Sequence, residues 1–475
     1  MKVVVFDDDP TGSQTVHGCP LLLAADAASL RRALAHPSPL LFVLANSRAL
    51  APEAARQRLG ELCRNLRQAL GQIAAEEPAL AASLEPLVLV SRGDSTLRGH
   101  FPLELEVIEA AFGVPDARLL VPAFLPGGRT TVGGVHRLHG VPVHTSDFAR
   151  DRLFGYQTSD LAAYIEAKSG GRVPAAQVER LSLAELDAGP EVLIARLAAL
   201  APGAWVVVDA ERPQQLSALG AAALTLMAPA AAERWGRPRR FLFQAAASLI
   251  NGLVELGPQP RAGAALAALL RRDGVGRALP ALVLVGSHVP LADAQLAHLL
   301  AHQPACRLVE IDVAKVARVL EGPAPAELLA SLEAAWLAQL RELLAAGQTP
   351  VLATSRGELS CRNSGERRRL GLALAALMAR LAAALAPGLG CVISKGGITS
   401  HTLLESGLRC RAVELQGQLL PGLSLVLTGP EALVPALPVL TFPGNLGDSQ
   451  TLQQALALLQ EPPGPTPPGP GPRGC

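Results

Sequence analysis

Residues 91–100, with the sequence SRGDSTLRGH, combine the side chains in this chain best suited to binding a small anion. Four apolar residues at 87–90 predict a short buried strand before them, and an apolar run at 101–112 predicts a helix after them. The loop that leaves the carboxyl end of a strand in an open α/β sheet is a common place for ligands. Guanidinium groups grip carboxylate or phosphate, and an aspartate accepts hydrogen bonds from hydroxyls. This loop therefore suits a small polyhydroxy acid; the alternative is a salt-bridged surface turn.

An acidic group follows the apolar run at 3–6. Asp7, Asp8 and Asp9 are consecutive, and Pro10 and Thr11 come next. Such clusters bind Mg²⁺, accept hydrogen bonds from sugar hydroxyls or supply a general base. The same residues also fit a plain turn with a helix N-cap. Because three adjacent aspartates repel one another directly after a buried strand, we favour the functional interpretation.

A third polar loop follows the predicted strand at 118–121. Residues 127–131 read GGRTT, so free backbone N–H groups, a guanidinium and two hydroxyls form an anion site by composition. As the third such loop in one half of the chain, it supports the other two. Three histidines nearby lack a spacing typical of metal ligands, and we expect them to be solvated or hydrogen-bonded: His136, His139 and His144.

The second half of the chain carries loops of a different composition. A predicted strand at 281–285 leads to Gly286-Ser287, and another at 391–394 leads to Lys395, two glycines and a pair of hydroxyls. Glycines let backbone N–H groups approach a phosphate, and a helix that begins there favours an anion. Lysine is rare in this chain, so its position beside the Gly-Gly turn suggests a phosphate contact, although chance is the alternative. The turn at 443–447 would be a further small-residue loop after a strand, or a simple tight turn.

These loops need a scaffold that places the ends of several strands at one edge. Short apolar runs alternate with long Ala/Leu/Arg segments, which predicts parallel sheets covered by helices. We expect an α/β protein of two domains, each a mostly parallel sheet covered by helices, with the active site in the cleft between them. The expected parts are a sugar-acid-binding domain at 1–257, a connector at 258–280, a nucleotide-binding domain at 281–460 and a disordered Pro/Gly tail at 461–475.

Composition narrows the class of protein. The formal net charge of +1 over 475 residues gives no electrostatic reason to expect nucleic acid or an anionic membrane as a partner. Seven scattered cysteines form no CxxC or metal pattern, and no signal peptide is visible, so we expect reduced thiols in the cytoplasm. The apolar run at 370–389 contains Arg380, and we expect a helix of a soluble protein there rather than a membrane span.

Taken in order, the polar loops resemble the motifs of the four-carbon acid sugar kinases (tetronate kinases), and the resemblance extends to about residue 459. The matching segments are DDPTG at 8–12, DSTLRG at 94–99, PAF at 122–124 with GRTT at 128–131, GS at 286–287, GGITS at 396–400 and GNLG at 444–447. The chain departs from the family pattern at Arg92, where lysine is usual, at His288, and at Ile398, where an acidic residue is common. The departures concern the substrate more than the kinase class.

The resemblance implies ATP-dependent phosphorylation of the 4-hydroxyl of a threonate-, erythronate- or oxo-tetronate-like acid, with Mg²⁺ required. The residues expected to bind the acid are Asp8, Asp9, Arg92, Asp94, Ser95, Arg98, Arg129 and Thr130. The residues expected to bind the nucleotide are Ser287, Lys395, Gly396, Gly397, Ile398, Thr399, Ser400, Gly444, Asn445 and Gly447. Asp8 is the predicted base, Arg92 and Arg129 are expected to grip the carboxylate, and no metal ligand is assigned. A homodimer is considered as an assembly.

Two other functions fit part of the sequence. The start VVVFDDDPT matches the DxDxT motif of haloacid-dehalogenase-type phosphatases, in which Asp7 would be the nucleophile and Asp9 the acid/base. That chemistry also requires a later acidic pair and a lysine at the phosphoryl group, and no GDxxxD motif or suitably placed lysine is present. A sugar-acid sensor that binds ATP without turnover is the third reading.

Overall fold

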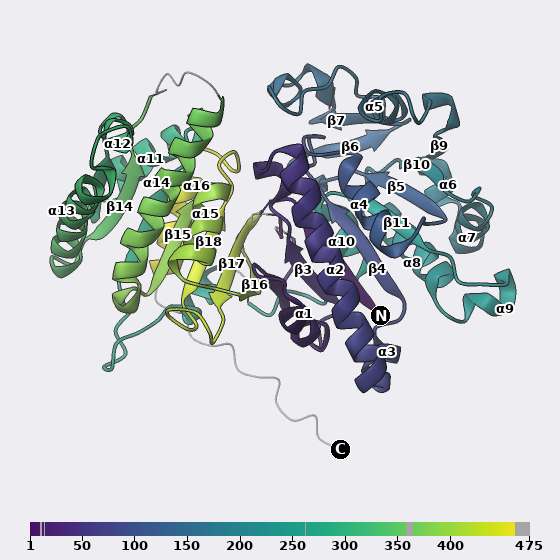
Figure 1. Ribbon diagram of the computed structural model, residues 1–475, viewed down its shortest axis with the longest axis horizontal. Coiled ribbons are helices and arrows are strands. Elements are labelled where there is room, and N and C mark those ends of the chain that lie inside the picture. Colours follow the sequence, from purple (N-terminus) through teal and green to yellow (C-terminus); the bar gives the residue numbers. More distant parts are fainter. Residues whose placement is uncertain (10–11, 14, 262, 358–363, 461–475) are drawn as a thin grey trace. The chain divides into compact units, whose positions relative to one another are not determined.

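The computed structural model describes residues 1–9, 12–13, 15–261, 263–357 and 364–460 (Figure 1). It divides into two compact units. The first comprises Met1–Gly257 together with Arg411–Leu415, and the second comprises Pro258–Cys410 and the chain from Gln416 onward. Three segments that the sequence analysis discussed lie outside the described residues: Pro10 with Thr11, Cys361, and the tail at 461–475.

The first unit is built on a parallel sheet of short, buried strands. In spatial order its strands are β2 (Cys19–Leu22), β3 (Leu40–Leu44), β1 (Lys2–Asp7), β4 (Leu87–Arg92), β11 (Phe241–Ala245), β5 (Ala117–Val121), β10 (Ala204–Val208) and β9 (Glu179–Leu181). Each neighbouring pair is parallel. Strand β1 is buried along its whole length, as expected for a strand covered on both faces. The prediction of a mostly parallel sheet is confirmed.

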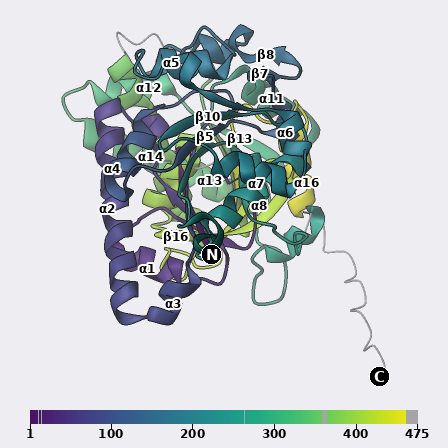
Figure 2. The ribbon, with the colours of Figure 1, turned by 90° about the vertical axis from the view of Figure 1, so that its right-hand side faces the viewer.

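Helices cover this sheet. They are α1 (Ala27–Leu34), α2 (Pro52–Glu76), α3 (Pro78–Ser83), α4 (Leu103–Phe112), α5 (Leu161–Lys168), α6 (Leu183–Asp187), α7 (Pro190–Ala198), α8 (Pro213–Met227), α9 (Ala231–Trp235) and α10 (Ala247–Leu253). Helix α2 contacts α1, α3 and α4 (Figure 2). Leu62, Leu66 and Ile108 from these helices pack with Val4 and Leu242 of the strands in one apolar core.

A small antiparallel sheet follows strand β5 in the chain. It consists of β6 (Arg129–Val132), β7 (Val135–Leu138) and β8 (Val141–Pro142). A second apolar cluster of the first unit joins Leu97, Tyr156 and Tyr164. The third polar loop of the sequence analysis therefore forms the start of a hairpin rather than a free loop, because Arg129 already pairs with Leu138.

The second unit contains another parallel sheet, with one antiparallel pair at its end. In spatial order its strands are β13 (Cys306–Ile311), β14 (Thr349–Thr354), β12 (Ala281–Val285), β15 (Cys391–Lys395), β18 (Pro438–Phe442) and β17 (Leu423–Thr428). They are followed by β16 (Ala412–Leu420), of which the part from Gln416 onward belongs to this unit. The pairs from β13 to β18 are parallel, and β17 pairs antiparallel with β18. The α/β class predicted for this half is also confirmed.

The helices of the second unit include one long apolar element. They are α11 (Pro290–His302), α12 (Val313–Leu320), α13 (Pro325–Ala345), α14 (Ser364–Leu385), α15 (Gly397–Thr402) and α16 (Thr451–Gln460). Within the described residues, one helical stretch, Gly365–Gly388, is long and apolar enough to cross a membrane, and half of it is buried inside the protein. Leu377, Leu381 and Ala382 lie in the protein interior, as expected for a helix that covers a sheet.

The boundary between the units differs in detail from the predicted connector. Leu266, Ala267 and Leu270, which were assigned to the connector at 258–280, are buried in the core of the second unit. The segment Arg411–Leu415 belongs to the first unit, although it is more than 150 residues away in the chain. It pairs antiparallel with β2, with Val413 opposite Leu21. No local sequence pattern signals that pairing.

Candidate functional site

The parallel register of the first unit brings two of the predicted loops together. Asp7 lies opposite Arg92 across the β1–β4 pair, so the carboxyl ends of both strands stop at the same level. The N–H of Asp8 then donates to the carbonyl of Arg92 at 3.1 Å. Parallel pairing thus places the acidic run beside the SRGDSTLRGH loop, as the strand-end argument predicts.

Arg48, which the sequence analysis did not single out, lies at the centre of these carboxylates. Its Nε and Nη2 donate to the two oxygens of Asp8 at 2.9 and 2.6 Å. Its Nη1 lies 3.5 Å from Asp9 and 3.9 Å from Asp94. Burial alone would lower the pKa of Arg48, but these three carboxylates raise that pKa well above its ordinary value. Arg48 follows the apolar run at 40–44, which is typical of a buried strand, so the strand-end rule would have found it.

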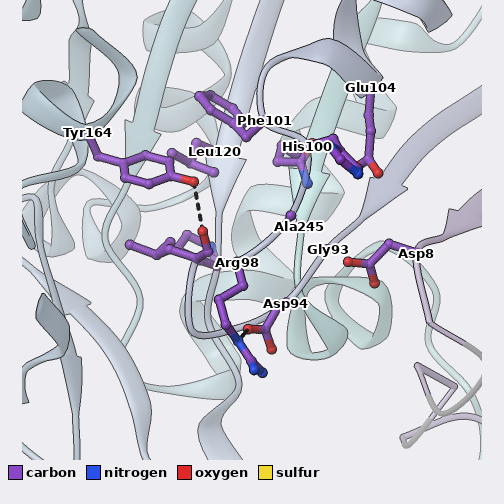
Figure 3. Close-up of a pocket in the computed structure, with 14 residues that line it drawn as sticks. Asp8, Gly93, Asp94, Arg98, His100, Phe101, Glu104, Leu120, Tyr164 and Ala245 are labelled. Atoms are coloured by element: carbon purple, nitrogen blue, oxygen red, sulfur yellow. Dashed lines mark hydrogen bonds and ion pairs between the residues drawn. The ribbon is translucent and has the colours of Figure 1, made fainter. Parts of the chain in front are cut away.

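Asp94 is held as a carboxylate by its neighbours. Arg98 Nε donates to it at 2.7 Å, and the Thr96 hydroxyl donates to the same oxygen. Burial would raise its pKa, but Arg48 and Arg98 outweigh burial and keep that pKa well below its ordinary value. Figure 3 shows Arg98 reaching Asp94, with Asp8 on the other side of Asp94. An ionised Asp94 can accept hydrogen bonds and cannot donate them.

Asp7 behaves differently from its two neighbours. It is fully buried, and Arg92 Nη1 lies 3.6 Å from its Oδ1. Burial, reinforced by Asp8 and Asp9, raises the pKa of Asp7 to about 7 despite Arg92. A Cβ placed on Gly12 would lie 2.1 Å from Asp7 Oδ1, so the backbone of the turn packs directly against this carboxyl. Asp7 is thus an interior group, poorly placed as an exposed nucleophile.

Arg92 and Arg129 differ in how they meet the acidic cluster. Arg92 Nη1 lies 3.5 Å from Asp8, and its Nε is buried with no protein partner. Arg129 donates from Nη1 to the carbonyl of Gly127 at 2.6 Å, and its guanidinium lies over the Phe124 ring. Burial, with Arg98 nearby, lowers the pKa of Arg129. Arg129 Nε is also buried without a protein partner, so both arginines keep donors for a ligand.

Ser95 and Thr130 contribute mainly through the backbone in this structure. The Ser95 carbonyl is 2.8 Å from His136 Nε2, and Thr130 pairs with Arg137 in the hairpin. His136 is fully buried and also contacts the Thr131 hydroxyl at 2.9 Å. Burial lowers its pKa to about 4, so the imidazole is neutral. Both of its ring nitrogens have hydrogen-bond partners, as expected for a hydrogen-bonded histidine.

A small cavity of about 20 Å³ opens beside Asp8 and Asp94 (Figure 3). Its lining includes Glu104, at the start of α4, together with apolar groups of Phe101 and Tyr164. The Glu104 carboxylate accepts hydrogen bonds from the Ser47 and Ser91 hydroxyls. Burial and Asp8 raise the pKa of Glu104. The cavity has room for about one water-sized polar group.

In the second unit, the ends of β12, β15 and β18 meet at one edge of the sheet. The Gly286 N–H donates to the Lys395 carbonyl at 3.1 Å, and the Gly396 N–H donates to the Phe442 carbonyl at 2.9 Å. A Cβ on Gly286 would lie 2.1 Å from Thr399 Oγ1, and one on Gly444 would lie 2.5 Å from Ser287 Oγ. The structure therefore places these three loops, which are far apart in the sequence, next to one another.

The side chains of these loops divide into two sets. Ile398 and Asn445 are exposed, and Ser287 is half-buried. Ser400 points inward and donates to the Ser394 carbonyl at 2.9 Å. Lys395 is fully buried, where its amine donates to the Pro443 carbonyl at 3.1 Å and lies over the Phe442 ring. Burial lowers its pKa to about 7. A contact between Lys395 and a phosphate stays a prediction.

Arg356, also missed by the sequence analysis, organises the Ser287 loop. Its Nη1 donates to the Ser287 carbonyl at 2.7 Å and to Asp293 at 2.9 Å, and its Nη2 donates to the Val285 carbonyl at 3.0 Å. Like Arg48, it lies a few residues beyond an apolar run, here at 350–353. Gly447, in the turn after β18, has a φ of 82° and lies against Thr451.

Among the described residues, no group of three or more His, Cys, Asp or Glu side chains is placed to hold a metal ion. The clustered aspartates of the first unit instead face arginines, as described above.

Comparison with known families matches both halves of the chain. Residues 3–253 match the model of a sugar-binding N-terminal domain, and residues 282–452 match that of a nucleotide-binding C-terminal domain. The Arg–Asp cluster lies in the first match, and the three glycine-containing loops lie in the second.

Several similar proteins are named as kinases. A D-threonate kinase of Salmonella typhimurium is 27% identical over 97% of this chain and 99% of its own length. A D-threonate kinase of Cupriavidus necator is 30% identical over 78% of this chain and 80% of its own length. A D-erythronate kinase of Heliobacterium modesticaldum is 31% identical over 39% of this chain and 41% of its own length.

Solved structures share the fold at lower identity. A Salmonella typhimurium protein with the provisional name tRNA synthase covers 96% of this chain and 98% of its own, with a TM-score of 0.63 at 17% identity. A Haemophilus influenzae protein covers 96% of this chain and 100% of its own, with a TM-score of 0.57 at 16% identity. At these identities the likeness concerns the fold alone.

Proposed function

We propose, from the premise that this chain belongs to the four-carbon acid sugar kinase family, that it transfers the γ-phosphoryl group of ATP to the 4-hydroxyl of a threonate- or erythronate-type acid. One observation carries the proposal beyond the family match. The unit that matches a sugar-binding model holds arginines and carboxylates around one strand edge, which suits a hydroxy acid. The unit that matches a nucleotide-binding model holds converging backbone loops, which suit phosphates.

In the first unit, we assign the carboxylate of the acid to Arg92 and Arg129. Each keeps a buried Nε without a protein partner, and a guanidinium binds a carboxylate through two parallel hydrogen bonds. We propose that six residues order the hydroxyls of the acid: the carboxylates Asp8, Asp9 and Asp94, and at the rim Ser95, Arg98 and Thr130. Lysine in place of Arg92 or Arg129 is expected to raise the KM for the acid, because an ammonium group cannot form the two parallel hydrogen bonds of a planar guanidinium group.

Asp8 remains the proposed base for the 4-hydroxyl proton. It is the carboxylate that faces both Arg48 and Arg92 at the end of β1. As a base it must loosen its two hydrogen bonds to Arg48. Asp8→Asn is expected to lower kcat; an effect on KM alone would make Asp8 a binding residue.

In the second unit, we propose that ATP phosphates bind the backbone at Ser287, Gly396–Ser400 and Gly444–Gly447. We propose that Mg²⁺ arrives as part of the Mg–ATP substrate, where it bridges the phosphates and offsets their charge. The five described cysteines are buried free thiols, which supports a cytoplasmic enzyme.

The test is ADP release from Mg–ATP with D-threonate, D-erythronate and L-threonate, followed by phosphorus NMR to locate the phosphate on the product. ADP release that depends on one of these acids, with the phosphate on the C4 oxygen, is the expected result. ATP binding without turnover would favour the sensor interpretation. Phosphate release from a phosphorylated acid without nucleotide, abolished by Asp7→Asn, would favour the phosphatase; the relatives named above are kinases and give that alternative no support.

A further inference from the structure

Gln244 is a buried polar residue at the acid site that no motif identified. It is the fourth residue of β11, the strand between β4 and β5, and it lies opposite Ser91 on one side and Leu120 on the other. Side chains two apart on a strand share a face. Gln244 therefore projects on the same face as Leu242, which packs with residues of α4, and the lining of the cavity includes both Gln244 and Glu104 of α4.

The amide of Gln244 lies over the loop that carries Arg92 and Asp94. The Gly93 N–H donates to the carbonyl of Ala245 at 2.9 Å, which fixes the loop against the end of β11. A Cβ on Gly93 would lie 2.7 Å from Gln244 Nε2, so this amide packs directly against the backbone of Gly93. The side chain is thus held close to the acid-binding arginine and aspartate.

One end of this amide has no protein partner. Gln244 is about nine-tenths buried, and its Oε1 is fully buried with no hydrogen-bond donor within reach. An unpaired buried carbonyl costs free energy unless a ligand or water supplies the donor. The adjacent cavity, about 20 Å³, is lined by Asp8 and Asp94 as well as by Gln244, and it accommodates one hydroxyl group.

We infer that Gln244 determines specificity by accepting a hydrogen bond from the C2 or C3 hydroxyl of the acid in this cavity. The inference rests on the proposed function. The C4 hydroxyl is excluded because it must stay accessible to the phosphoryl donor. An acid that lacks the matching hydroxyl would leave Gln244 Oε1 unpaired, and sites built to bind a hydroxyl discriminate strongly against analogues without it.

The experiment compares four-carbon acids that differ by one hydroxyl. The full-length enzyme is assayed for kcat/KM with its best tetronate, with 3,4-dihydroxybutanoate, which lacks the C2 hydroxyl, and with 2,4-dihydroxybutanoate, which lacks the C3 hydroxyl. We expect the wild type to disfavour one analogue by about tenfold or more, and Gln244→Met to reduce that ratio to within about threefold. Gln244→Glu keeps an acceptor oxygen in place and should retain the discrimination, at lower kcat/KM because its charge adds to those of Asp8 and Glu104.

Gln215→Met is the matched control. Gln215 is also a buried glutamine of the first unit, but its amide is paired with Glu211, Arg212 and Asp187, away from the cavity lining. Its loss should lower the melting temperature and leave the discrimination ratio unchanged. Thermal melts of all variants separate folding defects from specificity, and Gln244→Leu replaces Gln244→Met if the latter does not fold.

Failure of the proposed function and failure of the inference about Gln244 give different results. A wild type that turns over no four-carbon acid contradicts the proposed function. A wild type that is active but accepts both analogues as well as the tetronate overturns the inference, and so does a Gln244→Met enzyme that keeps the full discrimination.

Discussion

At the scale of single residues, the candidate site in the first unit depends on how its buried carboxylates are paired with arginines. Arg48 contacts Asp8, Asp9 and Asp94 at once, so one guanidinium offsets three carboxylates that would otherwise repel one another. Buried charges of this kind are tolerated only when they are paired and hydrogen-bonded. The proposed acid site is therefore organised around a cation from the loop after β3.

Arg48→Lys should lower kcat/KM for the acid by about tenfold or more, because an ammonium cannot reproduce the two-pronged bond to Asp8. Steady-state kinetics with the best tetronate measures the effect. The control is Arg180→Lys, at an exposed ion pair with Asp160, which should leave kcat/KM unchanged. Equal kinetics in the two variants would contradict the central role of Arg48.

Asp7→Asn should make stability less dependent on pH. The folded-state pKa of Asp7, about 7, is above its ordinary value of 3.8, so burial favours the neutral form. The contribution of Asp7 to stability is fully present below about pH 4 and is lost as the pH rises through 7. Asn has no charge to bury, so the variant should be more stable than the wild type at pH 8, by on the order of a few kcal/mol at most, and the difference should vanish toward pH 4.

Urea unfolding of Asp7→Asn and wild type at pH 5 and pH 8 checks this prediction. Asp147→Asn serves as the control, since Asp147 is almost fully exposed and should show no such pH-dependent difference. A variant that is destabilised equally at both pH values would show that Asp7 is ionised and paired in the folded protein.

At the scale of elements, the loops after β12, β15 and β18 depend on one another, because side chains of one loop pack against the backbone of the next. Gly396 has a φ of 119°, and a Cβ there would approach Thr399 Oγ1 and the Ser287 N–H at 3.2 and 3.4 Å. A side chain at this position would disturb two loops at once. The backbone amides proposed to face the phosphates depend on that fit.

Gly396→Ala should weaken ATP binding by about tenfold or more, because alanine rarely adopts this φ and the loop must shift. Calorimetric titration with ATP, and separately with the acid, measures both affinities; the acid affinity should not change. Gly371→Ala, at an open position within α14, is the matched control and should bind both ligands normally. Loss of acid binding with intact ATP binding would reverse the proposed roles of the two units.

At the scale of the whole molecule, the first unit is not a continuous piece of chain. Arg411–Leu415 closes the β2 edge of its sheet, and Leu23 and Ala24 donate backbone hydrogen bonds to the Arg411 carbonyl. A chain that ends at Gly257 loses this pairing and exposes Cys19 and Leu21. An unpaired strand edge of this kind destabilises a sheet and invites association.

A chain of residues 1–257 should therefore unfold at lower urea concentration than the same chain with residues 411–415 joined through a Gly/Ser linker. Denaturation midpoints, with light scattering to detect aggregation, make the comparison. A linked strand in which Val413 is replaced by proline is the control, because proline interrupts the ladder opposite Leu21. Identical midpoints for all three chains would show that the segment is dispensable.

The sequence by itself determined the α/β class and the position of the polar loops at strand ends. Strands such as Lys2–Asp7 and Leu87–Arg92 could be predicted because their short apolar runs end abruptly in charged residues. The rule that ligands meet the carboxyl ends of strands then placed Asp8, Arg92 and Asp94 in one region. Applied to every predicted strand, the same rule would also have found Arg48 and Arg356.

Only the tertiary structure decided what these side chains touch. β11, with Gln244, was not predicted, because its five residues merge into the apolar run of α10. The alternation of the strand turns the Lys395 amine into the core, toward the Pro443 carbonyl, a direction that its position beside the Gly-Gly turn did not indicate. Strand order, side-chain direction and the distant pairing of Arg411–Leu415 depend on contacts between residues far apart in the chain, and no local pattern encodes them.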